Sequence, residues 1–319
     1  MASVLEAVVP RAGADHRSRS KLRVAGLALA FVGVALAAVV LIDGIVAGVL
    51  AGRTGSADTV ARAAAWGFGL TGVAFITIKT GIAVILVGIL TRLWYRVEAV
   101  KVALPALVPA ARNGSPLTAA TIATPYGRAT VTATKPKALF VHRMARTLWA
   151  PMLAMGVMAV LAGFIVSLIQ TGKTVPDPSL ATRLSAWVQG LQFLGEGFVL
   201  SGISFLLGTI LYALRTGGGE VQESLGLPVT TLNMPRTAKI FIGLMALGLM
   251  VEMFQFVVYL YTTTLNDPTT IASYFAWLGP TREVGLGFLL SGVVLALATI
   301  ARALGFQFWR LREIVTFGR

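Results

Sequence analysis

Four ionisable side chains interrupt long apolar stretches of the sequence. Lys79 and Glu252 lie near the middle of two such stretches, and Asp43 and Glu196 lie toward the ends of two others. An ionisable group at the depth of a lipid bilayer is costly, and it usually marks an ion or proton pathway or pairs with an opposite charge. These four residues are therefore candidates for a solute or ion pathway.

Lys79 and Glu252 carry opposite charges and are expected at similar depths, so they form a candidate ion pair. Such a pair fits a gate, a proton-coupling element or a contact for a bound ion. It equally fits a structural ion pair, or two groups that face separate polar cavities. Asp43 and Glu196 fit an outward-facing vestibule, or solvated positions at the level of the lipid headgroups.

Few other residues offer catalytic chemistry. The two histidines, His16 and His142, both lie outside the apolar stretches, and the sequence contains no Cys. These counts exclude a membrane haem with two His ligands, thiolate metal sites and iron–sulfur clusters. Asp43 is the only Asp inside an apolar stretch, so a pair of aspartates for intramembrane proteolysis is missing. We therefore expect no enzymatic activity, no cofactor and no metal.

The composition indicates that the elements holding these residues are membrane-spanning helices. Of the 319 residues, 56% are hydrophobic and 13% are charged, whereas charged residues make up about 25% of a soluble domain. A transmembrane helix needs about 20 mostly apolar residues. The sequence predicts an all-α, polytopic bundle of six transmembrane helices, at residues 24–50, 65–91, 148–170, 191–214, 240–262 and 284–306.

The distribution of Lys and Arg predicts the orientation. These residues concentrate before the first helix, between the second and third, between the fourth and fifth, and after the sixth; the opposite loops hold only Arg53, Arg62, Lys173, Arg183 and Arg282. Cytoplasmic loops carry the excess of Lys and Arg, so both termini are expected in the cytoplasm. The composition is typical of bacteria, and the expected location is the plasma (inner) membrane.

The net charge of +14 has a second consequence. A one-sided basic excess attracts anionic lipids to the cytoplasmic surface. The sequence shows no nucleic-acid recognition module, so we expect the lipid bilayer and its anionic lipids as partners and no nucleic acid. Other membrane proteins, or further copies of this chain, stay open as partners.

An internal repeat organises the chain into helical hairpins. The stretch "GEGFVLSGISFLLGTI" at 195–210 recurs as "GLGFLLSGVVLALATI" at 285–300 and more weakly as "WGFGLTGVAFITIKTG" at 66–81. Each copy forms the second helix of a hairpin, so the repeats are parallel rather than inverted. The sequence predicts three parallel two-helix repeats around a pseudo-threefold axis, with a central site between them.

Small residues recur on one face of these even-numbered helices. Glycine and Ser or Thr allow close approach of helix backbones and hydrogen bonds between helices in lipid. Packing is the expected role of this small-residue ridge, with the lining of a pore as the alternative. The ridge consists of Gly67 and Thr71, Gly197 and Ser201, and Gly287 and Ser291.

The repeat also shows where the candidate charges break its symmetry. Lys79 occupies the place that Thr209 and Thr299 take in the other copies, and Glu252 takes the place of Ala162. A site with a single occupant requires such asymmetry. We therefore add Thr209 and Thr299 to the candidate pathway residues.

One long connection, predicted to be cytoplasmic, separates the first two hairpins. Thr-rich segments around Pro125, Tyr126 and Gly127 predict a β-hairpin over 121–134. The segment "KALFVHRMARTLW" is typical of a short amphipathic helix in the headgroups, which assigns His142, Arg143 and Arg146 to lipid contact. The run "TGGGE" at 216–220 predicts a flexible helix end. The resulting division is a tail (1–23), hairpin (24–100), loop (101–147), hairpin (148–223), connection (224–239) and hairpin with C-terminal tail (240–319).

Two functions fit these observations. A transporter or channel for a small solute or ion is favoured by the repeats and the asymmetric charges within the membrane. A non-catalytic accessory subunit of a larger membrane complex is favoured by the shortage of polar pathway residues and the abundance of small-residue faces.

Overall fold

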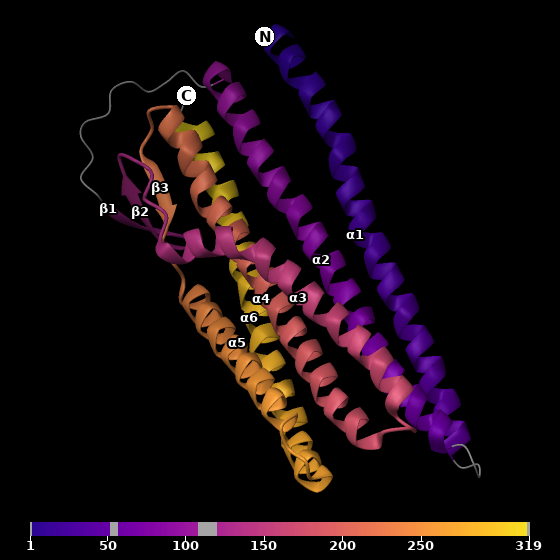
Figure 1. The fold of residues 1–319 in the computed structure, drawn as a ribbon. Helices are drawn as coiled ribbons and strands as arrows, with labels where there is room; N and C mark the ends of the chain where they lie inside the picture. The colour runs from indigo at the N-terminus through magenta and orange to yellow at the C-terminus, as the bar shows by residue number, and fades with distance from the viewer. Residues whose placement is uncertain (1, 52–56, 108–119, 318–319) are drawn as a thin grey trace.

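Six long helices make up most of the protein. In a computed structural model, the described backbone covers residues 2–51, 57–107 and 120–317 (Figure 1). All six helices are long and apolar enough to span a membrane, which confirms the predicted all-α membrane bundle. Their bounds are α1 (Ala2–Ala51), α2 (Ala57–Leu107), α3 (Phe140–Lys173), α4 (Pro178–Ser224), α5 (Arg236–Thr262) and α6 (Pro268–Phe317).

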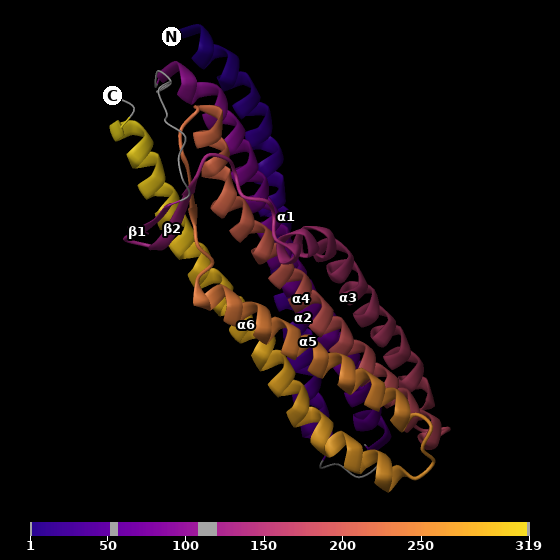
Figure 2. The same ribbon diagram turned by 90° about the vertical axis from the view of Figure 1, so that its left-hand side faces the viewer.

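Successive helices run in opposite directions and form three hairpins. Helix α1 begins and α6 ends at the same end of the bundle, which also carries a small β-sheet (Figures 1 and 2). We call this the terminal end. The connections from α3 to α4 and from α5 to α6 lie at the opposite end, which we call the loop end.

Helix α4 is the central helix of the bundle. Among the described residues it contacts α2, α3, α5 and α6, whereas α1 contacts only α2. In its most apolar segment 78% of the residues are buried, and no other spanning helix exceeds 33%. Within the described ranges α2 and α6 do not touch, although a closed threefold ring would bring them together. The predicted pseudo-threefold closure is therefore wrong, because α4 separates the first hairpin from the third.

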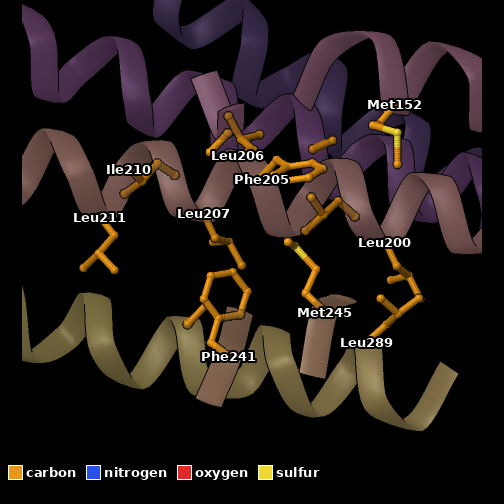
Figure 3. Packing of buried hydrophobic residues seen from close by; sticks show 14 of the residues in the cluster. Met152, Leu200, Phe205, Leu206, Leu207, Ile210, Leu211, Phe241, Met245 and Leu289 are labelled. Carbon is orange, nitrogen blue, oxygen red and sulfur yellow. The ribbon is translucent and has the colours of Figure 1, made fainter. Parts of the chain in front are cut away.

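A large apolar core surrounds the middle of α4. Leu200, Phe205, Leu206 and Leu207 project from this helix toward its neighbours (Figure 3). Met152 of α3, Phe241 and Met245 of α5 and Leu289 of α6 complete the contacts drawn there. This packing leaves the middle of the bundle apolar.

Glycines bring the helices of the second and third hairpins close together. A methyl group on Gly195 would lie 2.7 Å from the carbonyl oxygen of Gly156, so α4 and α3 approach at backbone contact distance. A methyl group on Gly248 of α5 would likewise lie 2.9 Å from the carbonyl oxygen of Gly285. Such close approach gives van der Waals contact that lipid tails cannot replace. Gly195 and Gly285 correspond in the repeat, so part of the repeated stretch does have one packing role.

The predicted small-residue ridge, by contrast, makes a different contact in each copy. Gly197 packs against Glu252 of α5, and Gly67 faces Asp43 of α1. A methyl group on Gly287 would meet no described atom within 4 Å. The expectation of one shared contact face is therefore wrong, because the three even helices have different neighbours.

A three-stranded antiparallel sheet covers the terminal end. Strands β1 (Ala120–Thr124) and β2 (Gly127–Thr132) form the predicted hairpin, and Gly127 adopts a φ of 129° in its turn. Strand β3 (Val229–Leu232) was not predicted and pairs with β2 in the order β1-β2-β3. Its β-branched sequence "VTTL" was the available signal. The connection between α4 and α5 is thereby fixed to the sheet.

Two local expectations at the terminal end are wrong. The segment assigned to a separate amphipathic helix is the start of α3, which continues without interruption from Phe140 to Lys173. The segment 216–220 is helical, and its glycines are buried. A methyl group on Gly218 would lie 2.6 Å from the Arg310 guanidinium carbon. These glycines therefore give room for a buried arginine rather than ending the helix.

Candidate functional site

Glu196 forms ion pairs with two cations from other helices. Its carboxylate lies 3.4 Å from Nζ of Lys79 on α2 and 2.9 Å from Nη2 of Arg282 on α6. The Glu196 side chain is only 4% exposed, and those of Lys79 and Arg282 are 19% and 25% exposed. Together with Glu252, these residues form what we call the charge cluster. It joins helices from all three hairpins.

Glu252 lies beside these pairs without a partner of its own. The residue is completely buried, and neither carboxyl oxygen has a hydrogen-bond partner among the described residues. A methyl group on Gly197 would lie 2.8 Å from Cγ of Glu252, and one on Gly285 would lie 2.7 Å from its Oε1. The two glycines, from α4 and α6, therefore make the space that the carboxyl group occupies. Burying a charged carboxylate without a partner is very costly.

The predicted ion pair between Lys79 and Glu252 is wrong. Lys79 pairs with Glu196, and the Glu252 oxygens accept no hydrogen bond from any described residue. The reason is the order of the helices, because the described residues of α2 contact α4 but not α5. Glu196, expected from the sequence at an outer vestibule or among the lipid headgroups, is instead the acidic centre of the cluster.

Arg282 is a member of the cluster that the sequence interpretation missed. It was assigned to an outer loop, but it lies within α6. Its guanidinium carbon is 4.1 Å from the centre of the Phe193 ring, and its Nε is buried without a partner in the described structure. Arg282 takes the place of Gln192 in the repeat. A polar residue at the same place in both copies was the available signal.

Two polar stripes lead from the charge cluster toward the loop end. On α4, Gln189, Gln192 and Glu196 are spaced for one helix face; on α5, Glu252, Gln255 and Tyr259 have the same spacing. The Tyr259 hydroxyl donates to Oε1 of Gln189 at 3.1 Å. Apart from Glu196 and Glu252, these residues were not among the predicted candidates.

The amides of these stripes bind backbone carbonyl groups of neighbouring helices. Nε2 of Gln192 donates to the carbonyl oxygens of Phe68 and Gly69 on α2, both at 3.1 Å. Nε2 of Gln255 donates to the Leu278 carbonyl oxygen on α6 at 3.0 Å. Side-chain hydrogen bonds between helices hold a membrane bundle where hydrophobic attraction cannot. The stripes thus fix the helices that present the four ionisable groups.

The predicted threonines do not join the cluster. Thr209 donates to the Phe205 carbonyl oxygen within α4 and lies about 20 Å along that helix from Glu196, at 1.5 Å per residue. Thr299 is 2.9 Å from the hydroxyl of Thr237 on α5. These candidate threonines do not converge with Lys79 and Glu252, because Lys79 meets α4 at Glu196 rather than at Thr209.

The other predicted residues lie apart from the cluster. Asp43 is half-buried on α1, which touches only α2 within the part of the chain that the structure describes. Thr71 donates to the Gly67 carbonyl oxygen in its own helix. Ser201 is buried with no partner for Oγ among the described residues, whereas Ser291 is exposed.

The three residues assigned to lipid headgroups differ in exposure. Arg143 and Arg146 are exposed. His142 is 6% exposed, and its ring centre lies 4.9 Å from that of Tyr212 on α4. The assignment of His142 to headgroup contact is therefore wrong, because its side of α3 faces α4.

Two larger cavities lie on opposite sides of the packed core. The loop-end cavity has a volume of about 450 Å³ and reaches Gln189 and Phe68. The terminal-end cavity has a volume of about 570 Å³ and reaches Thr209 and Tyr212. The first cavity therefore ends at the polar stripe of α4 that continues to Glu196.

Neither metal ligation nor a known relative explains the cluster. No group of three or more His, Asp or Glu residues in the described part of the chain could hold a metal ion. No protein family, curated protein or solved structure matches this chain. The protein is a multi-pass membrane protein.

Proposed function

We propose that this protein moves a small solute or ion across the membrane and that the charge cluster is its binding site. The observation that carries the proposal is the meeting of Lys79, Glu196, Glu252 and Arg282, from four helices, inside an apolar bundle. Ionisable residues within the membrane-spanning part of a protein usually mark substrate or ion pathways.

The two cavities support a pathway along α4. Gln189 lines the loop-end cavity and precedes Glu196 by two helical turns, whereas Thr209 lines the terminal-end cavity. Leu200 and Leu207 belong to the packed core that separates the cavities. Passage then requires the helices around α4 to move, which is the behaviour of a transporter rather than of an open pore.

An unpartnered arginine nitrogen in the cluster favours an anion. Glu196 pairs with both Lys79 and Arg282, and the exposed Glu283 lies 3.6 Å from Nη1 of Arg282. The buried Nε of Arg282 has no acceptor among the described residues. An anion bound there would provide the acceptor that the arginine lacks within the described structure.

A flux assay with two neighbouring variants tests the proposal. Vesicles containing the purified protein are loaded separately with chloride, phosphate or acetate, and efflux is compared with that from protein-free vesicles. Lys79→Thr keeps the Glu196–Arg282 pair and introduces the residue of the sister copies. We expect it to reduce flux about tenfold, since a hydrogen bond to a charged group contributes about 1.5–3 kcal/mol.

The matched control is Lys239→Thr. Lys239 is exposed near the start of α5 and lines neither of the two larger cavities, so the same chemical change is made outside the cluster. Flux should be retained. Absence of flux for all three anions, or full flux in Lys79→Thr, would contradict the proposal.

The accessory-subunit alternative has one observation in its favour. The α6 face that carries Gly287 and Ser291 is not covered by any described part of the chain. In α4 the corresponding face is covered by α5. If the protein acts as a subunit, Gly287→Leu should release a co-purifying membrane protein in mild detergent while leaving vesicle flux unchanged.

The proposed orientation places both termini in the cytoplasm of a bacterial cell. The excess of Lys and Arg in segments joined to the terminal end supports it. A reporter fused after Arg319 should be active in the cytoplasm, and one inserted in the connection between α3 and α4 should be active outside.

A further inference from the structure

The terminal-end cavity is a candidate ligand site distinct from the charge cluster. Its volume of about 570 Å³ lies in the usual range for small-molecule sites. Three parts of the chain form its walls: α2, α4 and the start of α3 with the residues just before it. Its distance from the cluster, about 20 Å along α4, makes it a separate site.

Two cations face this cavity from one wall. Arg146 on α3 is exposed and forms no ion pair with any described residue, and Lys135 pairs with Glu220 on the opposite wall. Trp94 and Val97 of α2 and Ala213 of α4 supply apolar surface nearby. The cavity therefore combines one cation without an ion-pair partner in the described structure, one lysine–glutamate ion pair, and an aromatic and aliphatic surface.

We propose that this cavity binds the phosphate headgroup of an anionic phospholipid. Arg146 would contact the phosphate group through its guanidinium, which is suited to phosphate geometry. Lys135, whose charge Glu220 balances, would donate a further hydrogen bond to it. Basic pockets between transmembrane helices bind such headgroups at the cytoplasmic side of a membrane. The apolar walls would receive the beginning of the acyl chains.

Several features favour a lipid over free inorganic phosphate. The aromatic residues Trp94 and Tyr95 line the cavity and are exposed, and such residues prefer the boundary between headgroups and hydrocarbon. The cavity also offers much more space than one phosphate ion fills. A headgroup with its glycerol unit uses both the cations and the apolar walls.

The test measures lipid binding by the full-length protein in detergent micelles. Native mass spectrometry follows titrations with phosphatidylglycerol, phosphatidylcholine and inorganic phosphate. We expect phosphatidylglycerol to bind more tightly than phosphatidylcholine. Arg146→Gln should weaken its binding about fivefold, the factor that corresponds to about 1 kcal/mol per cation near a membrane surface.

Arg143→Gln is the matched control, since Arg143 is exposed on the same helix turn but does not line the cavity. It should bind phosphatidylglycerol as the unchanged protein does, and Arg146→Lys should recover part of the affinity. Equal loss in both Gln variants would overturn the proposal, as would equal binding of the two lipids. Phosphate binding that depends on Arg146 without phosphatidylglycerol binding would also overturn it. Because binding is measured without flux, the outcome is independent of the proposed transport function.

Discussion

Helices α4 and α6 have closely related sequences but very different surroundings. Residues 186–223 and 276–313 align without a gap and share the Gly-Phe and Ser-Gly pairs of the repeat. In their most apolar segments, 78% of the α4 residues are buried but only 33% of those in α6. The repeat therefore sets which residues lie on each helix face, whereas the position of the helix in the chain determines what covers that face.

The difference is concentrated at the positions where the two copies diverge. Glu196 of α4 takes the place of Leu286 in α6, and it is the residue that joins cations from the first and third hairpins. Among the described residues, α6 contacts no helix of the first hairpin, so an acidic residue at this place in α6 could not join cations from two other hairpins. The acidic residue is thus present only in α4, the copy that lies between the other two hairpins.

The largest effect should come from making α4 resemble α6 at this position. Glu196→Leu leaves Lys79 partly buried without a carboxylate partner, and it leaves Arg282 with only the exposed Glu283, 3.6 Å away. We expect a loss of about 3 kcal/mol in the free energy of unfolding, at the lower end of the range for broken buried pairs because both cations keep some exposure. Unfolding of the purified protein by denaturant in micelles measures it.

A second substitution separates charge from packing in this result. Arg282→Gln introduces the residue that α4 has at the corresponding place. Combined with Glu196→Leu, it should restore part of the lost stability by removing one partly buried cation that has lost its closer carboxylate. If Glu196→Leu is as stable as the unchanged protein, the ion pairs do not hold the hairpins together.

The next largest change in stability should come from a substitution at the glycine position that α4 and α6 share. Gly197→Leu would force a side chain into Glu252, whereas Gly287→Leu would extend into open space. Overpacking of this kind costs about 1–3 kcal/mol, while exposed substitutions stay within about 0.5 kcal/mol. Thermal unfolding of both variants checks the contrast. Equal losses would mean that the two faces are covered alike.

Features that depend on local sequence could be predicted, whereas contacts between helices could not. Six spanning helices and the β-hairpin were predictable because each depends on local composition or turn chemistry. The partner of Lys79 was not, since it depends on α4 standing between α2 and α5. Arg282 was assigned to a loop because α6 extends well beyond its most apolar part, beginning at Pro268.

The polar stripes on α4 and α5 also show why the sequence alone does not predict which helices make contact. Gln189, Gln192, Gln255 and Tyr259 are spaced for single helix faces, so their pattern was present in the sequence. Hydrogen bonds from these side chains to other helices depend on which faces meet. Periodicity identifies a face, but the neighbour of that face comes from the arrangement of all six helices.

The smallest expected effect concerns a feature that α4 and α6 share. Each helix begins with an Asp-Pro pair: Asp177 accepts a hydrogen bond from the Leu180 amide, and Asp267 accepts from the amides of Thr269 and Thr270. Hydrogen bonds from backbone and hydroxyl groups hold the pKa of both carboxyl groups below its usual value. A group with a lowered pKa stabilises the fold above its ordinary pKa of about 3.9, and this contribution is lost as the pH falls through the lowered value.

Asp177→Ala and Asp267→Ala should therefore lower the unfolding temperature at neutral pH by similar small amounts. The unfolding temperature of each variant should also fall less in acid than that of the unchanged protein. The carboxylate whose protonation causes part of that fall is absent from the variant. Unfolding temperatures measured between neutral and acidic pH check both statements. Unequal effects would show that the caps depend on what surrounds each helix. Equal effects would mean that the two copies are equivalent where contacts are local and differ only where other helices cover them.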